Sequence, residues 1–130
     1  MKIKKFFLLI NIFFFLYFAV QLLFYTDEFA FKNLGYFNHA IAGLSELIGI
    51  IFFSFFISLI LIMFYGMEKQ LPLFLTIFLI QFIIAINFWR YVLTNSPGET
   101  NLNIITFNAI IFSLVSLISF YILININKNN

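Results

Sequence analysis

The sequence contains no cysteine, a single histidine and very few charged side chains. Without cysteine the chain can form no disulfide, thiolate metal site or Cys-linked haem. One histidine also argues against a zinc or haem centre, because such centres need several His, Cys or carboxylate ligands. Only 9% of the residues are charged, whereas 64% are hydrophobic, a composition outside the range of ordinary soluble domains. We therefore expect no metal and no cofactor.

The familiar patterns of catalytic and nucleic-acid-binding sites are also missing. There is no Ser-His-Asp set, phosphate-binding glycine loop or paired carboxylates, so we predict no catalytic residues of the hydrolase or kinase type. A membrane enzyme acting on lipid or quinone lacks candidates for a nucleophile and a metal. Lys2, Lys4 and Lys5 form the only basic cluster, and they adjoin an apolar run. That position is typical of a membrane-orienting signal, so no nucleic-acid partner is expected.

What the sequence does have is four long runs without Asp, Glu, Lys or Arg, at 6–26, 47–67, 70–89 and 100–127. Each run is about as long as the ~20 residues with which a helix crosses ~30 Å of hydrocarbon. Backbone groups in hydrocarbon must be paired within the segment, which favours helices. The runs predict an all-α fold, an integral membrane antiparallel four-helix bundle forming one domain over 1–130. Its helices should cover about 6–25, 40–65, 71–92 and 104–124.

The first run could also be a secretory signal peptide. It is longer than the usual 7 to 15 apolar residues and no Ala-x-Ala site follows it, so we expect it to be retained as a helix. The segment 26–38 then interleaves acidic residues with aromatic rings. This pattern fits a segment lying at the lipid headgroups, with rings inward and charges outward, and equally fits a solvated loop. Gly35 would allow a turn there.

The distribution of basic residues predicts the orientation in the membrane. With the N-terminus inside, the cytoplasmic segments hold five of the seven basic residues and the outer segments hold two. The inner set is Lys2, Lys4, Lys5, Lys69 and Lys128, and the outer set is Lys32 and Arg90. The excess of basic residues favours both termini on the cytoplasmic side.

The most informative polar residue is Glu46, about two turns inside the second predicted helix. The turn at 66–70 is short, so we expect the second and third helices to pack side by side. Asn87 and Arg90 of the third helix would then approach Glu46, with His39 at the rim. Such a cluster would be either a structural clasp that neutralises Glu46 or a proton, ion or headgroup site, because an unpaired acid in hydrocarbon is costly.

Small residues indicate where helices approach each other closely. Gly43 and Gly49 share a stripe with Glu46, and Ser113 and Ser116 lie on the fourth helix; we expect these four to pack against neighbouring helices. Asn11, Tyr17 and Gln21 are the polar interruptions of the first predicted helix. Further polar or small residues inside the third and fourth spans are expected to serve packing rather than a substrate path: Gln81, Ala85, Asn108 and Ser119.

The run Gly-Leu-Ser-Glu-Leu-Ile-Gly, which contains Gly43, Glu46, Leu47 and Gly49, resembles the Glu-Leu-x-Gly signature of DoxX-like proteins. These are small four-helix membrane proteins of bacteria, some of them associated with redox or quinone-linked processes. The resemblance covers these seven residues and the plan of four helices. It implies a bundle-facing role for Glu46 and its neighbouring glycines. We expect a multi-pass integral protein of the bacterial inner membrane.

Two functions are consistent with these patterns. The first is a small non-catalytic inner-membrane protein or accessory subunit that binds a protein partner, a lipid or a quinone through the outer-half polar cluster. The second is a transporter or channel subunit in which Glu46 carries a proton or cation. One chain is too small to enclose a pore, so the second function requires a homo-oligomer.

Overall fold

The computed structural model describes residues 2–96, 98 and 100–126, and every regular element in these residues is an α-helix. The five helices are α1 (Lys2–Phe24), α2 (Thr26–Leu34), α3 (His39–Tyr65), α4 (Leu71–Thr94) and α5 (Leu102–Asn125). Four of them, all but α2, are long and apolar enough to cross a membrane. This indicates a multi-pass integral membrane protein.

The helix ends follow local chemistry. The Asn38 side chain accepts a hydrogen bond from the Ile41 backbone nitrogen at 2.9 Å and caps α3. Asn101 caps α5 in the same way. Pro72 lies in the first turn of α4, where the missing N–H costs least. Gly35 ends α2 with φ of 78°, a left-handed conformation that glycine adopts without strain, which confirms the predicted turn.

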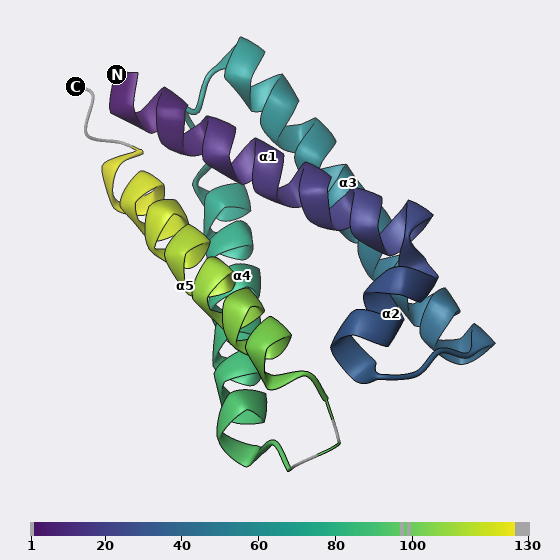
Figure 1. Cartoon of the computed structure of the whole chain (residues 1–130). Coiled ribbons are helices and arrows are strands. Elements are labelled where there is room, and N and C mark those ends of the chain that lie inside the picture. Colours follow the sequence, from purple (N-terminus) through teal and green to yellow (C-terminus); the bar gives the residue numbers. More distant parts are fainter. Residues whose placement is uncertain (1, 97, 99, 127–130) are drawn as a thin grey trace.

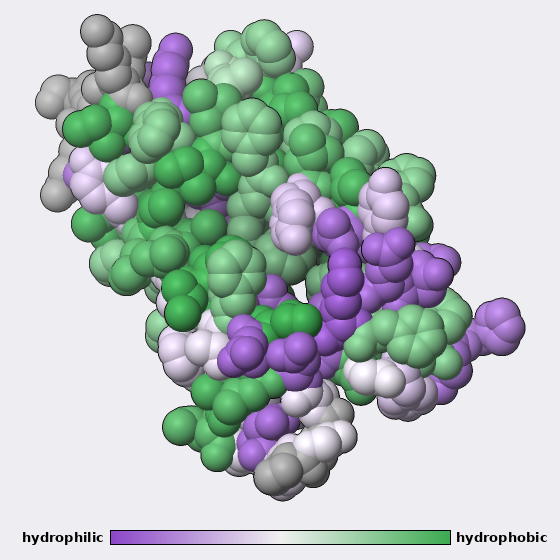
Figure 2. All heavy atoms as spheres, in the orientation of Figure 1, coloured by the Kyte–Doolittle hydropathy of each residue, from purple (hydrophilic) through white to green (hydrophobic). Residues whose placement is uncertain are grey.

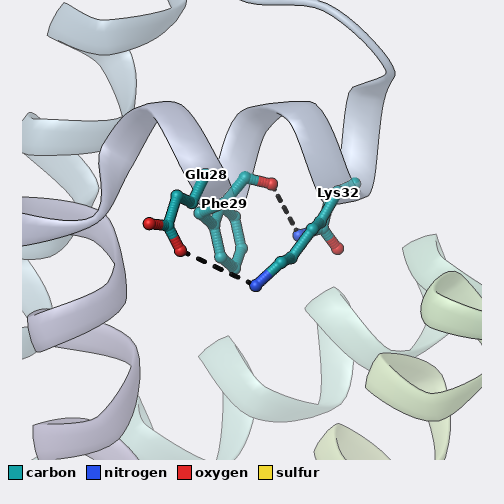
Figure 3. A network of polar contacts seen from close by, with 4 residues as sticks. Glu28, Phe29 and Lys32 are labelled. Atoms are coloured by element: carbon teal, nitrogen blue, oxygen red, sulfur yellow. Dashed lines mark hydrogen bonds and ion pairs between the residues drawn. The ribbon is translucent and has the colours of Figure 1, made fainter.

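The segment after the first span is helical rather than irregular, which corrects the prediction of a loop. Thr26 and Ala30 of α2 are buried, whereas Asp27, Glu28 and Lys32 are exposed. Glu28 Oε2 lies 3.7 Å from Lys32 Nζ, one turn apart on this helix (Figure 3). The Phe29 ring packs 6.5 Å from that of Phe18, so α2 is amphipathic, with this ring inward and its charges outward.

The long helices associate as α1 with α3 and α4 with α5 (Figure 1). Helix α1 also contacts α5, which joins the two pairs, and α2 contacts α1, α3 and α5. The prediction that α3 and α4 pack side by side because of their short connection is wrong, since their backbones do not run together. The connection contains two residues with positive φ, Gly66 at 99° and Lys69 at 64°, and the two helices diverge from it.

Phenylalanine rings of α1 explain this arrangement. Phe15 lies edge-on to Phe52 of α3 with a centroid distance of 5.2 Å. Phe14 contacts Phe112 of α5 at 4.9 Å, and Phe18 contacts the same ring at 5.0 Å. Aromatic pairs of this kind contribute about 0.5–1.5 kcal/mol of stability beyond the contribution of the apolar area that they bury. Helix α1 therefore supplies much of the hydrophobic core, and its rings lie between α3 and α5.

Candidate functional site

The structure does not bring the predicted polar cluster together. Glu46 and His39 are exposed on α3, and Asn87 and Arg90 are exposed on α4. Among the described residues, no hydrogen bond or ion pair joins any two of these four side chains. The Arg90 guanidinium instead lies over the neighbouring Tyr91 ring at 5.0 Å from its centroid. The clasp prediction is wrong because it depended on α3 and α4 being neighbours.

The two glycines predicted to pack against neighbouring helices lie in different surroundings. Gly49 is buried, and a Cβ at this position would lie 2.7 Å from Leu23 Cγ and 3.1 Å from Leu22 Cβ of α1. Helices α1 and α3 therefore approach each other closely at Gly49. Gly43 is exposed, and a Cβ there would meet no atom within 4 Å, so no helix in the described part of this chain packs against it.

The two predicted serines do lie between α4 and α5. Trp89 of α4 donates a hydrogen bond from Nε1 to Ser113 Oγ at 3.0 Å, across the pair of helices. Ser113 in turn donates to the Ala109 carbonyl at 2.7 Å, and buried Ser116 donates to the Ser113 carbonyl at 2.8 Å. Small hydroxyl side chains thus occupy this interface, as expected of helices that pack in lipid.

A polar network that sequence reasoning did not identify occupies the centre of the molecule. Asn11 of α1, Gln81 of α4 and Ser119 of α5 are each 0% exposed. Gln81 Nε2 donates to Asn11 Oδ1 at 2.8 Å. Ser119 Oγ lies 2.9 Å from Asn11 Oδ1 and 2.6 Å from Gln81 Oε1, and its one proton serves either acceptor. The network links three helices, and its two most distant residues, Asn11 and Ser119, are 108 positions apart along the chain.

The network is fully satisfied. Asn11 Nδ2 donates to the Phe7 carbonyl at 3.2 Å, and no buried side-chain nitrogen or oxygen among the described residues lacks a partner. A signal existed in the sequence, since Asn11 and Gln81 are strongly polar residues inside charge-free runs. The pairing itself was not predictable, because it requires knowing that α1 crosses α4 and α5. We interpret these three residues as a device that sets the register of the helices.

A second amide contact holds α2 in place. Asn108 of α5 donates from Nδ2 to Asn33 Oδ1 at 2.7 Å, and Asn33 Nδ2 donates to the Phe29 carbonyl at 2.8 Å. In Figure 2 hydrophilic side chains gather over α2 and hydrophobic side chains cover much of the visible surface of α1 and α5. The contact therefore ties the most hydrophilic helix to the inside of the apolar assembly.

Helix α3 has a long face that no other helix covers. Six of its exposed residues follow one another at alternating intervals of four and three, the spacing found in a helix that packs along another helix. This set, termed here the α3 seam, is Gly43, Leu47, Ile50, Ser54, Ile57 and Leu61. Glu46 flanks the seam and is exposed. Gly43 and Ser54 are small, a property of helix-facing rather than lipid-facing positions in membranes.

The chemical groups available are therefore few. Among the described residues, no set of three or more His, Asp or Glu side chains is close enough to hold a metal ion. Glu46 is a single carboxylate beside an open seam, and the buried amides are committed to each other. Such an arrangement can associate with another helix and offer it one acid.

Comparison with known proteins places the chain in no group: no family model, curated protein or solved structure matches it.

Proposed function

We propose that this chain is a non-catalytic subunit of a bacterial inner-membrane complex, and that the α3 seam receives a transmembrane helix of a different polypeptide. The observation that carries the proposal is Glu46, an exposed acid beside an uncovered seam that contains Gly43 with open space around it. Such a face is out of place against lipid. It is suited to a partner helix that approaches closely and supplies a hydrogen-bonding group for the carboxylate.

The proposed topology has four antiparallel spans with both termini in the cytoplasm. Lys4, near the start of α1, donates a hydrogen bond from Nζ to the Asn125 carbonyl, at the end of α5. The α3–α4 connection lies at the same end of the molecule (Figure 1). This end contains four of the five basic residues assigned to the inner side, and the fifth, Lys128, lies outside the described residues.

The packing of α3 on α1 gives the level of Glu46. Gly49 lies against Leu22 and Leu23, near the end of α1, so Glu46 is one turn further toward the α1–α2 junction. Residues 47–65 alone extend about 28 Å at ~1.5 Å per residue, close to the ~30 Å of the hydrocarbon. Glu46 then lies at the outer boundary of the hydrocarbon, shallower than the sequence suggested. A cationic or amide side chain near the end of a partner helix could reach it there.

A partner of a different kind fits better than a second copy. Two copies joined through the α3 seam would place an acid from each chain at the same level. The seam itself contains no basic residue that could pair with these acids. His39 lies two turns from Glu46 along the helix. The alternative function, transport of a proton or cation by Glu46, would require further chains to form a path, because Glu46 is on the outer surface of this chain.

Labelling should reveal the topology directly. Single cysteines replacing Lys69, in the α3–α4 connection, and Ser96, between α4 and α5, are expected to react from opposite sides of the membrane. An impermeant maleimide added to intact spheroplasts should label the Ser96 site alone. Labelling of both sites from outside would contradict the four-span topology.

Bulk added to the α3 seam should dissociate the complex and leave the chain folded. We expect Gly43→Leu and Ser54→Leu to reduce the complex, measured by blue native electrophoresis after mild detergent extraction, by at least tenfold. Thr76→Leu adds similar bulk at an exposed position of α4 and should have no effect. Thermal unfolding of all three purified variants should match that of the unaltered chain.

The chain recovered with the unaltered protein should contain a transmembrane helix with Lys, Arg, Asn or Gln near one end. Glu46→Leu should weaken its retention about fivefold or more, since a buried charge-assisted hydrogen bond is lost. A complex of identical chains only, or equal loss in Thr76→Leu, would refute the proposal.

A further inference from the structure

A hollow of about 370 Å³ lies at the end of the molecule where α1 begins, α5 ends and α3 turns toward α4. It is distinct from the α3 seam and from the buried network. Its lining comes from three parts of the chain: Lys4, Lys5 and Leu8; residues 62–68; and Ile126. Helices far apart in the sequence thus build it together.

The lining has two chemical parts. Leu8, Ile62 and Ile126 are buried, and together with Met63 they make an apolar floor. Lys4 and Lys5 stand on the α1 side of the hollow, and Glu68 stands on the side of the α3–α4 connection. An occupant suited to this lining has an apolar chain joined to an anionic group. Membrane phospholipids have this construction.

The two lysines differ in what they already bind. Lys4 Nζ donates to the Asn125 carbonyl and thereby satisfies the end of α5. Lys5 is exposed and makes no hydrogen bond or ion pair in the described part of the chain. Its ammonium group can therefore turn to a ligand in the hollow without breaking a contact.

The α3–α4 connection, on the side of the hollow opposite the two lysines, leaves room for a ligand. The chain turns at Gly66, whose φ is 99°, and a Cβ at this glycine would meet no atom within 4 Å. The neighbouring Met67 is half-buried against the core. The connection thus forms a wall with an open edge. In the proposed topology, this edge opens toward the cytoplasmic headgroup layer. Anionic lipids in that layer attract basic side chains.

We propose that this hollow binds an anionic phospholipid, with its phosphate at Lys5 and Lys4 and the start of an acyl chain over Leu8, Ile62 and Met63. Glu68 repels a second negative charge, so the site takes one headgroup. The proposal does not depend on a partner at the α3 seam, since the hollow and the seam share no residue.

The test measures the phospholipid retained by the purified full-length chain in native mass spectrometry, after exchange into micelles that contain equal amounts of phosphatidylglycerol and phosphatidylcholine. The unaltered chain should retain phosphatidylglycerol in preference. Lys5→Gln should reduce that retention about fivefold, the effect of one lysine at an anionic membrane surface. Glu68→Gln should increase it.

Lys32→Gln is the matched control, because it removes the same charge from α2, where Lys32 lies beside Glu28. It should leave retention unchanged. Equal loss in Lys5→Gln and Lys32→Gln would mean that overall charge alone attracts the lipid, and it would overturn the site. Equal retention of both lipids by the unaltered chain would overturn it as well. Unfolding temperatures of the three variants should agree, since all three side chains are exposed.

Discussion

Replacing Asn11 by leucine is expected to lower the free energy of unfolding by about 2 kcal/mol, the cost of leaving a buried polar group without its partner. Asn11 Oδ1 accepts the hydrogen bond of Gln81 Nε2, and leucine of similar size cannot. Gln81 would keep its contact with Ser119 through Oε1 but would bury an unsatisfied N–H. Unfolding in mixed micelles with increasing dodecyl sulfate, followed by circular dichroism, measures the loss.

The triple variant Asn11→Leu, Gln81→Leu, Ser119→Ala removes every member of the network and should recover most of this loss. No buried donor is stranded in it, and apolar groups of similar shape can replace a polar pair at little cost. Ser54→Ala is the control, because Ser54 is exposed and donates only to the Ile50 carbonyl of its own helix. If the triple variant is less stable than Asn11→Leu, the three residues do not act as a unit.

Gly49→Ala should destabilise the chain by about 2 kcal/mol relative to Gly43→Ala, the range expected for an overpacked core. The new methyl at position 49 would lie 2.7 Å from Leu23 Cγ and 3.1 Å from Leu22 Cβ, so α1 and α3 would have to separate. At position 43 the methyl meets no atom within 4 Å. Both changes alter helix propensity equally, so their difference isolates the packing term.

The same unfolding assay applies to both glycine variants in the isolated chain. Equal stability of the two would mean that α1 and α3 do not meet at Gly49. The Gly43→Leu variant used for the proposed complex adds a second comparison. It should keep the stability of the isolated chain and lose only the association, whereas Gly49→Leu should lose the fold.

Several features of the fold followed from local sequence. The four charge-free runs correspond to α1, α3, α4 and α5, and α3 begins one residue before the predicted range 40–65 and ends with it at Tyr65. Several other ends lie further out than predicted: α1 includes the lysines at its start, α4 continues to Thr94, and α5 begins at Leu102. The segment that became α2 was misjudged, since its short run of mixed polarity shows a helical pattern only when Thr26 and Ala30 have a core to face.

The candidate site was the least predictable part. Glu46, Asn87 and Arg90 were expected to meet because a short connection usually joins neighbouring helices. The chain instead places the rings of α1 between α3 and α5, so the acid remains on an open surface and the amides of α1 and α4 meet in the centre. Gly43, Glu46 and Gly49 follow one another at helical spacing, as predicted, but among the glycines only Gly49 faces a neighbouring helix.

Four apolar spans, and the places where most of them begin and end, were predictable from the amino-acid sequence, because backbone pairing, capping and helix length in hydrocarbon are local properties. Which spans pair, which polar side chains are buried and which face stays open became known only from the folded arrangement of the helices. Lipid is as apolar as the helices and does not drive a particular pairing. The choice therefore depends on the fit of individual side chains, such as Gly49 against Leu22 and Leu23, which only the assembled helices reveal.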